Sequence, residues 1–241
     1  MKLTRALLIP LILLASSCVV ALPLNGVVGN GRVVAAALPV SGFSAVKNMS
    51  SARVLLNRGP SSSATVKIDE NLVEELDIHV QNDVLIIGLR PGRSIYRYTE
   101  FTVTVSLPTL REIGIYGSGD IAAAETFRGQ SIALGIYGSG SISGNFEYGC
   151  VSALIKGSGD IRAVGSADRL EAGIEGSGDI LASGLKAESA IVRVNGSGSC
   201  TLTVEEALDA RIHGSGSIYY YGSPMISQVD AGSGGLRKIG F

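Results

Sequence analysis

The sequence predicts an all-β protein whose C-terminal half winds as a β-solenoid, and two observations carry this prediction. First, the tripeptide Gly-Ser-Gly recurs at intervals of 18 to 21 residues, and a fixed internal period indicates a repeat architecture. Second, the chain has 32 glycines, no tryptophan and only 5% aromatic residues, so its core must consist of small aliphatic side chains in thin layers. The seven tripeptides begin at Gly117, Gly138, Gly157, Gly176, Gly196, Gly214 and Gly232.

Residues 1–18 have the pattern of a signal peptide that ends in a lipidation motif. Two basic residues precede an apolar run over residues 6–14, which is too short to span a bilayer. Small residues then lead directly into Cys18 and resemble a bacterial lipobox, in which this cysteine carries the lipid. We therefore expect an outer membrane lipoprotein, anchored to the membrane by its N-terminal lipid and facing the periplasm or the cell surface. The alternative is ordinary cleavage after Ala21, which would remove Cys18.

Residues 19–39 contain several glycines without a clean period, so we expect a tether between anchor and folded part. Residues 40–110 alternate short β-type runs with turn sequences and predict a β-rich N-terminal part. Its clearest strand is 101–107, which alternates apolar and polar residues and ends at Pro108. Asp69 stands at the N-cap position of one or two helical turns. The other expected strands are 43–46, 52–56, 64–68, 77–80 and 84–87, the last two joined by a hairpin.

Residues 111–241 hold the repeats, and each repeat is long enough for one closed coil. Nineteen extended residues span roughly 60 Å, a suitable circumference for one turn of a β-helix. Aliphatic residues flank the tripeptides at fixed positions, and period two places them and both glycines on the inner face. The serine between the glycines, and the Asp or Ser after them, then point outward. We expect the inward glycines to allow a sharp bend or a close approach to the opposite wall.

The residue just before each tripeptide belongs to an outward column. Stacked coils would place Tyr116 beside Tyr137 and Lys156 beside Glu175, and both are chemically compatible pairs. The full column is Tyr116, Tyr137, Lys156, Glu175, Asn195 and His213.

Charge and cysteine content exclude some partners and sites. The net charge of −1 gives no reason to expect nucleic acid as a partner. Cys150 and Cys200 fall on different parts of coils two turns apart, so we expect both thiols to be free. His79 and His213 are the only histidines and lie in different halves of the chain, which predicts no histidine metal centre. We expect no cofactor.

The repeats and their flanks resemble a known family. The region of similarity begins with Val-Ser-Gly-Phe at 40–43, continues through Gly-Ser-Gly-Asp-Ile units, and includes Tyr-Tyr-Tyr-Gly-Ser-Pro at 219–224. Over residues 40–239 the chain is similar to the putative auto-transporter adhesin, head GIN domain (DUF2807), of bacterial envelope proteins. The resemblance implies a right-handed single-stranded parallel β-helix, an exported location and an adhesin-like role. The positions where the repeat often has Asp but this chain does not are Ser141, Ser199, Ser217 and Gly235.

Asp160 and Asp179 lie on neighbouring coils and are weak candidates for a metal site, because two close carboxylates favour a cation or a shared proton. The alternative is that each aspartate accepts hydrogen bonds from backbone at its bend. The exchange of Asp and Ser in this column favours that alternative, so we predict no metal site. We also predict no enzyme. Lys156, Asp160 and Arg162 would suit a carbohydrate-active β-helix enzyme, but a regular repeat brings mixed charges together anyway.

Tyr219 and Tyr221, with Tyr116 and Tyr137, are the predicted binding surface, because aromatic side chains form platforms for sugars and protein partners. Period two turns Tyr220 inward, as a cap on the final coil. We therefore predict an adhesin-like binding module with a glycan or protein ligand of unknown identity. The alternative is a structural envelope scaffold that assembles side to side or end to end; the sequence does not indicate the oligomeric state.

Overall fold

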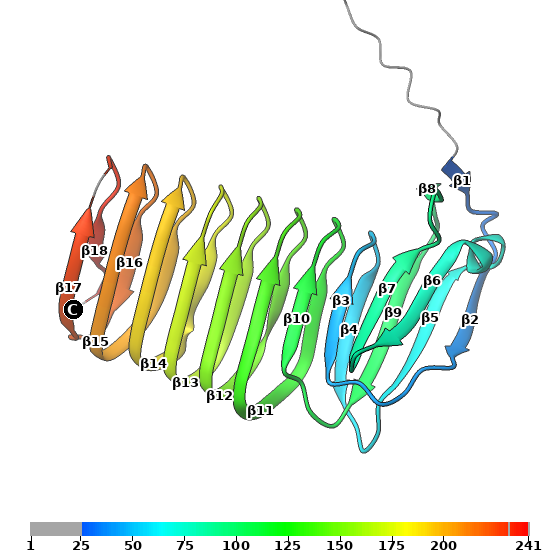
Figure 1. The fold of residues 1–241 in the computed structure, drawn as a ribbon, viewed down its shortest axis with the longest axis horizontal. Coiled ribbons are helices and arrows are strands. Elements are labelled where there is room, and N and C mark those ends of the chain that lie inside the picture. Colours follow the sequence, from blue (N-terminus) through cyan, green and yellow to red (C-terminus); the bar gives the residue numbers. More distant parts are fainter. Residues whose placement is uncertain (1–25, 231, 241) are drawn as a thin grey trace, which may run out of the picture.

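The structure, a computed structural model, describes residues 26–230 and 232–240. The described residues are nearly all β, with 66% in strands and 3% in a helix, and wind into a solenoid of about 7 turns with parallel stacked strands (Figure 1). The predicted all-β solenoid is therefore confirmed. Cys18 and the rest of the expected signal peptide lie outside the described residues.

The five long strands of the repeat region each form most of one coil. They lie side by side along the long axis of the molecule, and the Gly-Ser-Gly tripeptides form the corners at one edge (Figure 1). Strand pairing keeps repeat positions in register, so that Ile142 pairs with Ile161 and Ile155 with Ile174. The strands are β11 (Ile121–Ile136), β12 (Ile142–Ile155), β13 (Ile161–Ile174), β14 (Ile180–Gly196) and β15 (Cys200–Gly214).

The aliphatic residues that flank the corners form the core of the solenoid. Both predicted columns are fully buried, from Ile115 and Ile121 at the first tripeptide to Ile212 and Ile218 at the sixth. Cys200 takes one of these positions and is equally buried. Because burying one such side chain stabilises a fold by about 1.5–3 kcal/mol, these columns provide much of the driving force for folding.

The glycines of the corners are required by the close approach of neighbouring coils. A Cβ atom at Gly140 would overlap the carbonyl oxygen of Gly119, and the same overlap recurs at each later corner. Our expectation of a close approach to the opposite wall is therefore wrong, because the obstructing atoms belong to the preceding coil. Of the corner glycines, only Gly214 has a positive φ, 128°. Space between coils, rather than backbone conformation, excludes a side chain here.

Backbone hydrogen bonds continue the stack through each corner. The N–H of the middle serine donates to the first glycine of the preceding corner, as from Ser177 to the carbonyl oxygen of Gly157 at 3.1 Å. The earliest corner carries Ser50 and Ala52 instead of glycine. Its N–H groups bond to side chains rather than to another corner: Ser50 N–H donates to Asn48 Oδ1 at 3.1 Å. Glycine is thus needed only where one corner stacks on another.

Residues 40–110 continue the solenoid toward the N-terminus. Four strands stack in parallel beyond the repeats, and one hydrophobic core runs through both parts. β10 (Glu112–Ile115) pairs with β3, which pairs with β7, while β11 pairs with β4, which pairs with β9. These strands are β3 (Ala45–Asn48), β4 (Arg53–Arg58), β7 (Val84–Leu89) and β9 (Phe101–Leu107), and all four were expected from the sequence.

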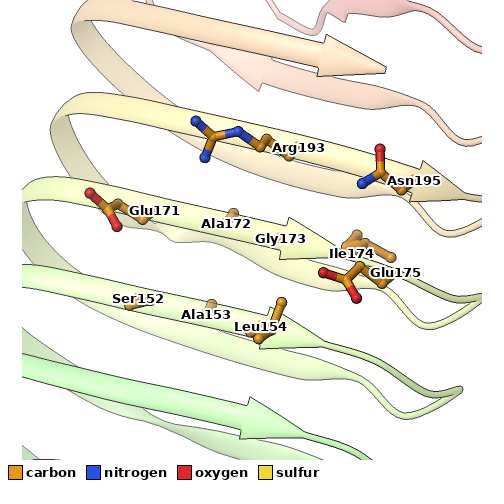
Figure 2. A pocket seen from close by; sticks show the side chains of 10 residues that line it. All are labelled: Ser152, Ala153, Leu154, Glu171, Ala172, Gly173, Ile174, Glu175, Arg193 and Asn195. Atoms are coloured by element: carbon orange, nitrogen blue, oxygen red, sulfur yellow. The ribbon is translucent and has the colours of Figure 1, made fainter. Parts of the chain in front are cut away.

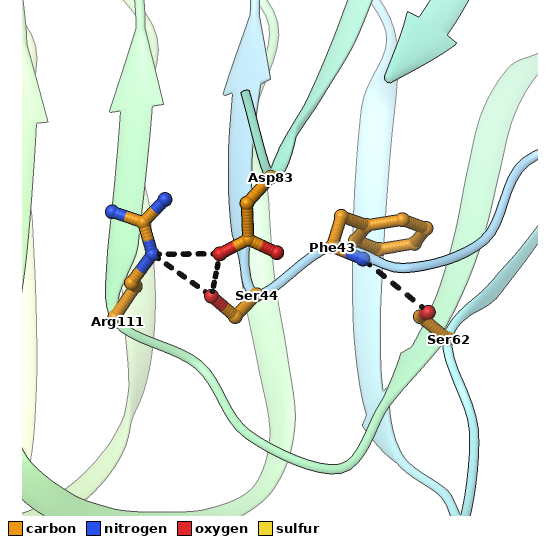
Figure 3. Close-up of polar contacts among 5 residues, drawn as sticks. All are labelled: Phe43, Ser44, Ser62, Asp83 and Arg111. Carbon is orange, nitrogen blue, oxygen red and sulfur yellow. Dashed lines mark hydrogen bonds and ion pairs between the residues drawn. The ribbon is translucent and has the colours of Figure 1, made fainter. Parts of the chain in front are cut away.

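Antiparallel strands cover the N-terminal end of the stack. The β6–β7 hairpin turns at Asn82 and Asp83, whose φ angles of 51° and 64° suit a two-residue turn. Asp83 also accepts hydrogen bonds from Ser44 Oγ at 2.6 Å and Arg111 Nε at 3.1 Å (Figure 3). These contacts, above all the one with Ser44, hold the pKa of the Asp83 carboxyl below its ordinary value. The covering strands are β6 (Leu76–Gln81), β5 (Ser63–Asp69) and β2 (Val33–Leu38).

The predicted tether over residues 19–39 is wrong for most of its described part. β1 (Gly26–Val28) pairs with β8 (Ser94–Arg97), and β2 pairs antiparallel with β5 along its whole length. The physical reason is that β5 would otherwise present an unpaired backbone edge, which β2 satisfies. Ala36 and Leu38 also pack against the core.

Asp69 fastens this N-terminal cap, although not in the way we predicted. The expected short helix is present as the 3₁₀ helix η1 (Glu70–Glu75), but the Asp69 side chain does not cap it. The buried carboxylate instead accepts hydrogen bonds from Thr99 N–H at 2.7 Å, Gly31 N–H at 2.7 Å and Thr99 Oγ at 3.0 Å. The hydrogen bond from the Thr99 backbone is the main cause that lowers the pKa of Asp69.

Three short strands close the C-terminal end. They are β16 (Ile218–Tyr221), β17 (Met225–Asp230) and β18 (Leu236–Lys238). Tyr220 is buried, as predicted, but it does not cap the final coil, because β18 pairs with β16 beyond it.

Replacing Gly178 by alanine is expected to lower the free energy of unfolding by about 1–3 kcal/mol, the usual effect of overpacking. The added Cβ would overlap the carbonyl oxygen of Gly159. Ser177→Ala in the same corner serves as control, since the Ser177 side chain is exposed and its loss should change stability by less than about 0.5 kcal/mol. Urea unfolding followed by circular dichroism measures both, and equal values would contradict the stacking argument.

Asp69→Asn is expected to lower the melting temperature at neutral pH, because the neutral amide is a weaker acceptor for the Thr99 and Gly31 N–H groups. The folded-state pKa lies below the ordinary 3.8, so this stabilisation is complete above pH 3.8 and disappears as pH falls through the folded-state pKa. The deficit of the variant should therefore shrink in acid. Glu74→Gln, at an exposed carboxylate on η1, is the control; an equal melting temperature for Asp69→Asn and wild type at pH 7 would refute the anchoring role.

Candidate binding face

The coil segments that lead into the corners form one outer surface, here called the front face. It comprises β10 and the final halves of β11 to β15, whose outward residues align from coil to coil. Three outward columns cross it. The column next to the corners is Tyr116, Tyr137, Lys156, Glu175, Asn195 and His213; the middle column is Gly114, Gly135, Leu154, Gly173, Arg193 and Arg211; the third is Glu112, Ala133, Ser152, Glu171, Ile191 and Asp209.

Tyr116 and Tyr137 stack on this face as predicted. Their ring centroids lie 4.6 Å apart with an interplanar angle of 10°, and each residue is 43% exposed. Each ring leans over a glycine of the strand that it follows: a Cβ at Gly135 would lie 3.0 Å from Tyr137 Cε2, and one at Gly114 would lie 3.2 Å from Tyr116 Cε2. The glycines therefore make room for the rings.

Our reading of the sequence missed Gly114 and Gly135, although the chain contains a signal for them. The hexapeptide Gly-Ile-Tyr-Gly-Ser-Gly occurs at both 114–119 and 135–140. An outward glycine two residues before an outward tyrosine, repeated in neighbouring coils, indicates a flat surface with an aromatic border.

Two shallow hollows follow the middle column and together form what we call the front groove. The first, about 240 Å³, lies over Gly114 and Gly135 and is bordered by Tyr137. The second, about 230 Å³, lies over Gly173 and is bordered by Glu171, Glu175, Arg193 and Asn195 (Figure 2). Ser152 and Leu154 line both hollows, so the two hollows adjoin at β12 and together extend from β10 to β14.

Ion pairs neutralise most charges of the front face. Four pairs connect charged side chains of this face to each other, to Lys47 on β3 or to Arg169 earlier on β13, and such partly exposed pairs contribute little to stability. They are Lys47–Glu112 at 3.0 Å, Lys156–Glu175 at 3.1 Å, Arg169–Glu171 at 2.8 Å and Arg211–Asp209 at 2.9 Å. Arg193 differs: among the described residues it has no ion pair, and its guanidinium lies beside the second hollow (Figure 2).

Glu112 raises the pKa of Lys47, which lies at the end of this face. The hydrogen bond from its ammonium to Glu112 is the main reason that the pKa of Lys47 is raised above 10.5. Lys47 is therefore a permanent cation at physiological pH, and Glu112 neutralises it.

Tyr219 and Tyr221 do not join the tyrosine stack of the front face. They lie on β16, which follows a corner, and Tyr219 pairs with Thr201 at the start of β15. Tyr116 and Tyr137 instead precede their corners, and they lie several coils away from β16. Tyr219 is half-buried and Tyr221 is 37% exposed. The four tyrosines thus form two separate surfaces, and the front groove lies beside Tyr137.

Asp160 and Asp179 bind backbone rather than each other. Asp160 Oδ1 accepts a hydrogen bond from the Asp179 N–H at 3.0 Å, and Asp179 Oδ1 accepts one from the Ser199 N–H at 2.7 Å. Asp120 and Ser141 repeat the arrangement at 2.8 Å. The aspartates are therefore backbone acceptors, as we expected, but the donors belong to the corner of the next coil and not to the bend of the aspartate itself. No group of three or more metal-binding side chains occurs in the described part of the chain.

The possible catalytic cluster is not assembled. Lys156 pairs with Glu175 on the front face, Asp160 lies in the corner with its carboxylate bound to backbone, and Arg162 is exposed on β13 beyond that corner. Neither cysteine forms a disulfide, as predicted. Complete burial raises the pKa of the Cys200 thiol to about 12, so this thiol is an inert part of the core.

Comparison with known proteins identifies the family. Residues 42–224 match the family model described as putative auto-transporter adhesin, head GIN domain (DUF2807). The chain belongs to this family. No curated protein matches the sequence.

Several solved structures share the fold. A putative adhesin from Bacteroides fragilis is 21% identical, with a TM-score of 0.83, and the match covers 89% of this chain and 100% of that one. A putative lipid binding protein from Parabacteroides distasonis is 25% identical, with a TM-score of 0.75, covering 89% and 99%. A putative adhesin from Parabacteroides merdae is 21% identical, with a TM-score of 0.69, covering 90% and 100%.

Within the described residues, no helix has the length and apolar character needed to cross a membrane.

Proposed function

We propose that this protein is an exported cell-envelope lipoprotein whose rigid solenoid presents the front groove as an adhesin-like binding module. The observation that carries this proposal is the pairing of Tyr116 and Tyr137 beside a glycine-floored groove. Both rings are 43% exposed and stack on each other. They stand in an outward column where the later coils carry polar or charged residues, so the solenoid itself does not require an aromatic side chain there. Exposed aromatic rings beside a hollow are typical of ligand sites. Membership of an adhesin family supports the same role.

The alternative role as an envelope scaffold is less well supported for end-to-end assembly. The antiparallel strands β2, β5 and β6 cover the N-terminal end of the stack, where a parallel coil of another molecule would otherwise fit. At the other end, Gln228 occupies the register position of the buried Ala210. A polar residue at a core position is typical of terminal repeats that end a solenoid. Side-to-side assembly has no comparable obstacle.

Removing both stacked rings with Tyr116→Ala and Tyr137→Ala is expected to abolish binding of the mature protein to immobilised glycans and matrix proteins while leaving its melting temperature nearly unchanged. Tyr221→Ala is the matched control, since its ring is similarly exposed but lies away from the groove. Surface plasmon resonance against a panel of both ligand classes measures the effect. If Tyr221→Ala removes binding and the double variant does not, the ligand site lies on β16.

Palmitate labelling of cells that produce the protein is expected to mark the wild type and not Cys18→Ala. The reason is that only a lipidated Cys18 would carry an acyl chain through the secretory route, whereas cleavage after Ala21 would discard this residue. Protease treatment of intact cells then distinguishes the cell surface from the periplasm. Equal labelling of wild type and variant would refute the proposed anchor.

A further inference from the structure

We infer that the ligand of the front groove is a short anionic oligosaccharide, one sugar ring of which packs against Tyr137 while an acidic group on another unit binds Arg193. This inference rests on the proposed function and names the ligand class. It follows from three features of the groove: a cation without an ion pair, a partly exposed aromatic ring and a shallow floor that contains two glycines beside Leu154.

Arg193 is the feature that selects charge. The carboxylates nearest to it along the groove are already engaged, Glu171 with Arg169 at 2.8 Å and Glu175 with Lys156 at 3.1 Å. When Lys156 and Arg169 are counted with the glutamates that they neutralise, the side chains around the second hollow carry one net positive charge, that of Arg193. Its planar donors match a carboxylate or a sulfate, which they can bind through two hydrogen bonds.

Tyr137 provides the apolar surface. Tyr116 covers one of its faces, because the ring centroids are 4.6 Å apart and nearly parallel. The other face is turned toward the next coil, where Lys156 follows in the same column, and Tyr137 stays 43% exposed and lines the first hollow with Ser152 and Leu154. A pyranose ring presents a flat array of C–H groups that suits such a surface, while its hydroxyl groups require polar partners nearby. Ser152 and Asn195 are available as such partners along the groove.

The glycine floor and the coil spacing determine the size of the ligand. Gly135 and Gly173 have no side chain of their own, but the Tyr137 ring and Leu154 Cδ1 lie close over them, so the hollows stay shallow and suit a flat ligand. Tyr137 directly follows β11 and Arg193 lies on β14, and these two strands are three strand spacings apart, which is roughly 14 Å between their backbones. A monosaccharide cannot reach both residues, whereas an oligosaccharide of a few units can.

Isothermal titration calorimetry of the mature protein tests this inference with uronate-containing oligosaccharides, their methyl-esterified neutral counterparts, and sulfated oligosaccharides of similar length. We expect at least one acidic ligand to bind about tenfold more tightly than its neutral counterpart, as for one charge-assisted hydrogen-bonded contact. Arg193→Gln should remove this difference by weakening only the acidic ligand. Tyr137→Ala should weaken the acidic and neutral forms alike. The uronate and sulfate arms show which acidic group the arginine prefers.

Arg162→Gln is the matched control, because Arg162 is an exposed arginine on β13 that also has no ion pair among the described residues and lies beyond the corner from the groove. Equal losses in Arg162→Gln and Arg193→Gln would overturn the inference in favour of general charge attraction. Tyr137-dependent binding of neutral sugars alone, or of a protein alone, would overturn the anionic ligand while leaving the proposed binding module intact. Absence of any binding that depends on Tyr116 and Tyr137 would overturn both.

Discussion

The stacking of one backbone corner directly on another is the constraint on which the rest of this structure depends. Serine N–H groups bond to glycine carbonyl oxygens of the preceding corner, as between Ser177 and Gly157, and no Cβ fits between the two layers. This close stacking holds every coil in the same register along the axis. Residues 18 to 21 positions apart in the sequence therefore become direct neighbours.

That register produces both the stability and the candidate site. On the inner face it aligns aliphatic residues into continuous buried columns, which are the core of a protein without tryptophan. On the outer face it aligns Tyr116 with Tyr137 and places Gly114 beside Gly135, so that one pair of repeated hexapeptides yields a stacked aromatic border and half of a groove floor. The corner aspartates stabilise the stack, because Asp160 and Asp179 accept hydrogen bonds from backbone N–H groups of the next coil.

The regular part of the fold was predictable from the sequence, whereas the N-terminal cap was not. The repeat period places each residue of 111–221 on a coil without any knowledge of distant contacts. The cap depends on antiparallel pairing between β2 and β5, segments that share no repeat and no turn, so no local pattern indicated that residues 33–38 belong to the sheet. Asp69 illustrates the same limit: its position before η1 suggested an N-cap, but its carboxylate turns to Gly31 and Thr99, which only the folded cap brings near.

The sequence alone determined the solenoid, its register, the free cysteines and the Tyr116–Tyr137 pair, because all of these follow from a period of about one coil and from the alternation of strand residues. Only the tertiary structure decided that the corner glycines are needed because the preceding coil lies so close. It also decided that Tyr219 and Tyr221 lie apart from the other tyrosines, and that Arg193 has no ion pair among the described residues. Those outcomes depend on the distances between coils and on the directions that long side chains take across them. Neither quantity is encoded in a repeat spacing.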